Sequence, residues 1–220
     1  TFATDLIVPT LDTLAPATGN VQVALDRSMM AGVTLSRAGL ALTLGAETIR
    51  LDTLYADHPG GRLDAVGAIG RPGSPPGQIT FVLGVDTLGS FAPLARWLRT
   101  QAGDTTGGPM GLDGDGQLVG GISGTTERWE LRGELHLASV GYGSFRAVAF
   151  HAEGAYGSIE GGPRLRASIE AESLAAGGFS SGRLRLTAAG PLESVAVRVE
   201  AGLPLESSVR AVLVAAADSA

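Results

Sequence analysis

The sequence contains no cysteine, and this absence removes several classes of protein at once. The chain of 220 residues has no disulfide framework, no thiolate metal site and no cysteine nucleophile. Aromatic residues make up only 5% of it and charged residues only 17%. No apolar run approaches the roughly 18 residues of a membrane-spanning helix. Because 44% of the residues are nevertheless hydrophobic, they must be spread over many short segments.

Basic residues are also scarce. The 16 basic residues, all of them arginine, are outnumbered by 22 aspartates and glutamates, which gives a formal charge of −6. Nucleic-acid binding through phosphates needs a basic surface, so we expect no nucleic-acid partner. A polybasic run for an anionic membrane surface is also missing. The sequence begins at Thr1 and ends in a strand-like apolar stretch, and we expect a segment of a longer protein.

Alternation of apolar and polar residues is the dominant pattern. Residues 164–172, 184–188 and 195–201 place apolar side chains at every second position, as a strand with one buried face does. Gly, Pro, Asp and Ser separate these segments, and we read the glycine-rich stretches 113–116 and 120–124 as turns. The pattern predicts an all-β protein of roughly a dozen strands, mostly joined as hairpins.

A weak internal repeat indicates an elongated array. Residues 131–145 align with residues 165–179 at a shift of 34 residues, with five of fifteen positions identical. Repeated units that cannot bury their own apolar face usually stack. Residues 90–100 break the period and predict one short helix. We therefore divide the chain into 1–103, a β-rich segment ending in this helix, and 104–220, a continuing β-repeat segment of the same sheet.

The apolar side of each strand needs a cover. The sheet can pack on a second sheet, close into a barrel, or curl around an apolar ligand. Aromatics, which usually fill a sandwich core, are few here, and the inward positions are aliphatic. This composition suits acyl chains lying in a groove, and the alternative is a dry core made of the same side chains. The candidate groove residues are Ile79, Phe81, Leu83, Leu135, Leu137, Leu165, Ile169, Leu184, Leu186, Val195, Val197 and Val199.

One polar cluster carries a different chemistry. A hairpin turning at 143–144 pairs His136 with His151 and Glu134 with Glu153 on the polar face. Two imidazoles and two carboxylates are a ligand set for Zn²⁺, and the alternative is a solvated strand face. The chain shows no Gly-x-Ser-x-Gly elbow. We predict a non-enzymatic protein without cofactor or metal, with a metal-dependent enzyme at this pair as the third interpretation.

Residues 60–98 and 164–202 resemble the TamB/AsmA-like family, the translocation and assembly module group. The shared feature is a cadence of a strand, a glycine and a strand ending near Asp-x-Leu, followed by a short Leu-x-x-Leu helix. The resemblance implies a U-shaped "taco" of antiparallel strands with an apolar interior. It also implies a periplasmic protein that is anchored in the inner membrane and reaches the outer membrane. The implied roles are phospholipid transport and outer-membrane protein assembly or secretion.

These observations give one fold and two functions from different classes. We expect an elongated antiparallel sheet curled into a U-shaped groove, with one short helix. The favoured function is a segment of a hydrophobic conduit whose partners are phospholipid acyl chains. The resemblance also implies a barrel partner, TamA, contacted by parts of the parent chain outside this sequence. The rival is a structural β-repeat segment of a secreted passenger or adhesin, with a dry core.

Overall fold

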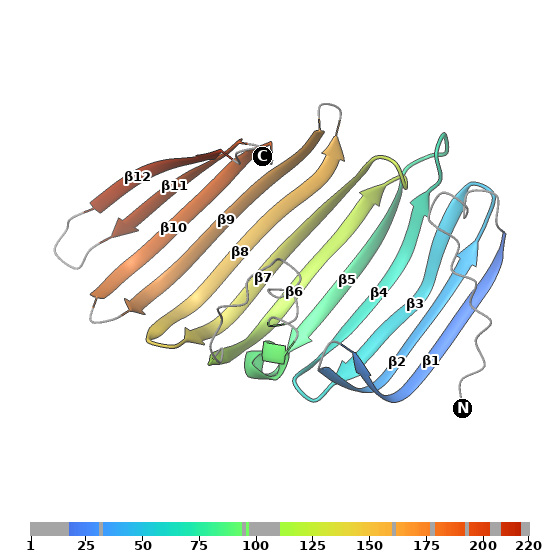
Figure 1. The fold of residues 1–220 in the computed structure, drawn as a ribbon, viewed down its shortest axis with the longest axis horizontal. Helices are drawn as coiled ribbons and strands as arrows, with labels where there is room; N and C mark the ends of the chain where they lie inside the picture. Colours follow the sequence, from blue (N-terminus) through green and yellow to red (C-terminus); the bar gives the residue numbers. More distant parts are fainter. Residues whose placement is uncertain are drawn as a thin grey trace.

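The described part of the chain forms one sheet of twelve strands that lie in sequence order (Figure 1). The computed structural model describes residues 18–30, 33–93, 96, 111–159, 162–176, 179–191, 194–202 and 208–216. The strands are β1 (Gly19–Met30), β2 (Val33–Leu44), β3 (Thr48–His58), β4 (Gly61–Gly70), β5 (Gly77–Val85), β6 (Leu112–Gly124), β7 (Trp129–Tyr142), β8 (Phe145–Ile159), β9 (Gly162–Ala176), β10 (Phe179–Pro191), β11 (Ser194–Gly202) and β12 (Ser208–Ala216).

Every neighbouring pair of strands is antiparallel, so the chain runs up and down across the sheet. The predicted all-β class and hairpin organisation are confirmed. Strand β5 pairs with β6 from Gly77↔Gly124 to Val85↔Gly116. One sheet therefore continues across the position at which we divided the sequence.

The sheet is a single layer and remains open. The accessible surface of the chain is 14121 Å², whereas a compact monomer of 22.3 kDa exposes about 9,400 Å². Only ten apolar residues are buried in the described part of the chain. The twelve strands in sequence order, with no second layer among the described residues, contribute to this large surface. Curling into a U is not seen here, because the described sheet is only slightly curved (Figure 1).

Helical structure is nearly absent from the described residues. A 3₁₀ turn, η2, spans Leu88–Phe91, and residues 92, 93 and 96 are helical. The rest of the helix predicted for residues 90–100 lies outside the described residues. Within the part of the chain that the structure describes, no helix has the length and apolar character needed to cross a membrane.

Two opposed bulges interrupt the pairing of β8 with β9. The register shifts between Arg146 and Val148 and again between Val148 and His151. Near these shifts Ala149 and Ser173 adopt φ of 50° and 52°, a conformation that residues other than glycine rarely take. Bulges bend a strand and increase its twist. The pairing of β8 with β9 is therefore irregular at one end of the two strands.

The 34-residue repeat has a structural meaning. It carries β7 onto β9, two strands further along the sheet. Leu131 and Leu165 both pair with Tyr156, and Leu135 and Ile169 both pair with Ala152. Equivalent residues of the repeat therefore lie in the same row across the sheet, two strands apart.

Candidate functional site

The twelve residues predicted to line the groove share one face of the sheet, here called the apolar face. The clearest row crosses β5 to β11, because each member pairs directly with the next. Parity along each strand places the other predicted residues on the same face. The row consists of Leu83, Leu118, Leu135, Ala152, Ile169, Leu186 and Val199.

A second apolar row runs beside the first, and small residues lie between the two rows. Ile79, Ile122, Leu131, Tyr156 and Leu165 pair in succession from β5 to β9. The residues between the rows form a lane across β6 to β10, about 19 Å long at the usual strand spacing. The lane consists of Gly120, Gly133, Gly154, Ala167 and Ala188.

Larger residues bound the lane at both ends, with Phe81 paired to Gly120 and Val197 paired to Ala188. The Phe81 ring lies over Gly120, where a Cβ atom would meet it. Over Gly154 the nearest atom to an added Cβ is the Arg166 carbonyl oxygen, at 3.5 Å. Phe81 therefore marks the β5 end of the lane, and Gly154 is a position where backbone forms its floor.

Most predicted groove residues are half-buried by their neighbours on the same face. Leu137 is the exception at 5% exposed, in the row next to the bulges. Leu184 packs against a buried cluster of Ala147, Ala171 and Leu174. The regular part of the face, around Leu135, therefore offers more apolar surface to a ligand than the bulged end does.

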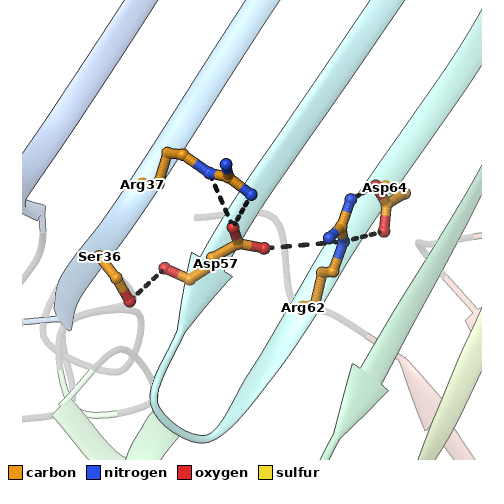
Figure 2. Close-up of polar contacts among 5 residues, drawn as sticks. All are labelled: Ser36, Arg37, Asp57, Arg62 and Asp64. Carbon is orange, nitrogen blue, oxygen red and sulfur yellow. Dashed lines mark hydrogen bonds and ion pairs between the residues drawn. The ribbon is translucent and has the colours of Figure 1, made fainter.

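The opposite face, here called the polar face, carries charged side chains, several of them paired, together with the exposed Val66, Val82 and Val119. Figure 2 shows a ladder across β2, β3 and β4. Two guanidinium nitrogens of Arg37 donate to the Asp57 carboxylate, at 3.1 and 2.9 Å. Arg62 lies 3.6 Å from the same carboxylate and donates to both oxygens of Asp64, at 2.7 and 2.8 Å. The hydrogen bond from Arg62 lowers the pKa of Asp64 below its ordinary value of 3.8.

A shallow open hollow of about 780 Å³ also lies on the polar face, across β5 to β10. Its lining includes Arg132, Glu134, Glu153 and Arg166 and all five residues of the lane, but none of the twelve predicted groove residues. Both signs of charge surround it. The hollow therefore lies behind the lane, on the opposite side of the sheet.

The predicted hairpin register is confirmed in the structure. Strand β7 pairs with β8 at His136↔His151 and Glu134↔Glu153, around a turn at 143–144. The two imidazole Nδ1 atoms lie 3.2 Å apart. The His136 Nε2 atom is 2.8 Å from the Glu134 carboxylate, which is also 3.9 Å from His151 Nδ1. The structure brings together three of the four predicted ligands, while Glu153 stays outside the cluster.

Sequence reasoning missed the surroundings of His58, at the end of β3. Its Nδ1 accepts a hydrogen bond of 2.9 Å from the Gly60 backbone N–H, and its ring lies against Phe91 with 4.8 Å between centroids. Burial lowers the pKa of His58 below its ordinary value of 6.5. No local signal in the sequence joins this turn to η2, because the contact spans more than thirty residues.

Comparison of the chain with protein-family models, curated proteins and solved structures gives no match.

Proposed function

We propose that the chain is a segment of a hydrophobic conduit that carries phospholipid acyl chains along its apolar face. This proposal rests on one observation. The sheet is a single layer, and no second protein layer covers its aliphatic face among the described residues. Apolar surface is stabilised by about 25 cal/mol per Å² when it leaves water. A face of this extent therefore favours an apolar cover, and acyl chains are the occupant that we infer.

The shape of the face supports an extended aliphatic ligand. The lane from Gly120 to Ala188 has a small-residue floor and an aliphatic row on either side. It runs across the strands, between Phe81 on β5 and Val197 on β11. Each buried methylene contributes about 0.8 kcal/mol. Many equivalent shallow contacts hold such a chain while leaving it free to slide.

The polar face supports a passive role. The described charged side chains include repeated pairs between neighbouring strands, such as Arg37 with Asp57 and Arg185 with Glu170. These pairs keep one face solvated while the other meets the lipid. Closure of the sheet into a U, a periplasmic location and a role in outer-membrane biogenesis belong to the same proposal, which rests for these points on the family resemblance.

Two adjacent residues on opposite faces give a matched test. Leu83 is half-buried on the apolar face and Val82 is 37% exposed on the polar face. The chain is produced in a diderm bacterium, purified without detergent, and its extracted lipids are quantified by mass spectrometry. We expect phospholipid with the unmodified chain, a clear loss with Leu83→Asn, and retention with Val82→Asn. A lipid-free chain, or equal loss in both variants, contradicts the conduit and favours a structural β-repeat.

A further inference from the structure

We infer that the hairpin of β7 and β8 binds one divalent transition-metal ion between His136 and His151, on the polar face. The inference is independent of the proposed lipid conduit, because these side chains point away from the apolar face. The ion would join the two strands through the Nδ1 atoms of the two imidazoles. Glu134 would act as a positioning residue through His136.

The distance between the two imidazoles fits a shared ion. In a tetrahedral zinc site the metal–nitrogen distance is about 2.0–2.1 Å, which separates two ligand atoms by about 3.3 Å. The Nδ1 atoms of His136 and His151 are 3.2 Å apart. The centroids of the two imidazole rings lie 4.4 Å apart, with an angle of 44° between the ring planes. The pair therefore needs only small side-chain movements to accept an ion.

The hydrogen bonds around His136 and His151 fit one placement of the ring hydrogens when both imidazoles are neutral. His136 Nε2–H donates to the Glu134 carboxylate at 2.8 Å, which leaves His136 Nδ1 with its lone pair in the neutral ring. That lone pair then accepts from His151 Nδ1–H at 3.2 Å. When the His151 hydrogen shifts from Nδ1 to Nε2, the Nδ1 lone pairs of both rings are free to bind one metal ion, and no proton is released. A carboxylate that holds the remote nitrogen of a metal-binding histidine is a recurrent feature of such sites.

The nearby charges favour a cation. Glu134 lies directly opposite Glu153, and like charges in facing positions destabilise a strand pair. Glu170 pairs with His151 on the other side, although its carboxylate already meets Arg185 at 3.0 Å. A dication between the histidines would offset the repulsion between Glu134 and Glu153. Imidazole nitrogen suits Zn²⁺ and Cu²⁺, whereas Mg²⁺ prefers oxygen ligands.

The binding test uses the full chain and its three histidines. Isothermal titration calorimetry with ZnCl₂ is expected to show one ion per chain. His136→Ala and His151→Ala should each weaken binding by at least ~10-fold, which is the lower limit for loss of an outer partner. His58→Ala is the matched control, because His58 lies four strands away on β3, and it should leave affinity unchanged. CuCl₂ should bind more tightly than ZnCl₂, and MgCl₂ should not bind.

A second test distinguishes the hydrogen bond from His136 to Glu134 from the effect of a nearby negative charge alone. Glu134→Gln should weaken Zn²⁺ binding ~10- to 100-fold, whereas Glu153→Gln, which removes only the facing charge and no hydrogen bond to a ligand histidine, should weaken it much less. Electron paramagnetic resonance with Cu²⁺ should report two imidazole nitrogens in the unmodified chain and one in His151→Ala. Circular dichroism of each variant reports whether the sheet is retained. Binding that survives loss of both His136 and His151, or equal effects of the two glutamate variants, overturns the assignment.

Discussion

Apolar side chains are buried to different extents in two regions of the sheet, the bulged end of β8 and β9 and the regular middle. At the bulges Ala147 and Ala171 are each 1% exposed, and Val140, Phe145, Phe150 and Leu184 pack around them. In the regular region Leu83, Leu135 and Leu186 remain half-buried on a flat apolar face. The contrast teaches that the most deeply buried apolar side chains of the described sheet lie beside these bulges. A flat stretch depends on something other than its own strands.

The largest expected effect comes from placing a charge in the bulged cluster. Ala171→Asp buries a carboxylate without a partner, and we expect a loss of at least ~3 kcal/mol or failure to fold. Ala188→Asp places the same group in the lane of the flat region, where we expect a loss below ~1 kcal/mol. Urea unfolding measures both.

A milder variant keeps this comparison measurable if Ala171→Asp does not fold. Ala171→Leu overpacks the same cluster and should cost ~1–3 kcal/mol, whereas Ala188→Leu should cost less. Equal losses at the two positions would mean that the flat region is packed as tightly as the bulged one.

A smaller effect of opposite sign is expected at the bulge residues themselves. Ala149 has φ of 50°, which costs a residue with a Cβ about 1–2 kcal/mol. Ala149→Gly removes this cost and loses about 0.5–1 kcal/mol through the more flexible unfolded chain. The net expectation is a gain of up to about 1.5 kcal/mol in the free energy of unfolding. Ala152→Gly, in regular pairing, should instead lose about 0.5–1 kcal/mol, and a loss at both positions would argue against the bulge.

The smallest effect is expected on the polar face, in the ladder of Figure 2. Because Arg62 lowers the pKa of Asp64, the folded state binds fewer protons here than the unfolded state. The stabilisation is therefore present above the ordinary pKa of 3.8 and is lost as the pH falls below it. Both side chains are exposed and screened by salt. Unfolding midpoints of Asp64→Asn and the unmodified chain should differ slightly at pH 6 and converge near pH 2.

Much of the fold could be predicted from the alternation alone. The period of two identified the strands and the shared face, and a two-residue turn fixed the pairing of His136 with His151. Such features depend on local geometry that each strand carries in its own sequence. The same reasoning found the aliphatic rows but not the lane between them, because the lane depends on how five strands align.

The predicted turns at 113–116 and 120–124 were wrong. Both stretches lie inside β6, where pairing with β5 and β7 overrides the local preference of glycine for turns. The bulges at Ala149 and Ser173 were also missed, since neither residue signals a positive φ. Curvature of the sheet depends on such bulges, and therefore the predicted U shape could not be derived from strand patterning.

The most direct test of the central claim asks what touches the apolar face in the cell. The photoreactive residue p-benzoylphenylalanine replaces either Leu186, on the apolar face, or its neighbour Thr187, on the polar face, and cells of a diderm bacterium are irradiated. The account predicts a phospholipid adduct at position 186 and none at position 187, detected by mass spectrometry of the purified chain. A protein adduct at position 186, or no difference between the two positions, would contradict it.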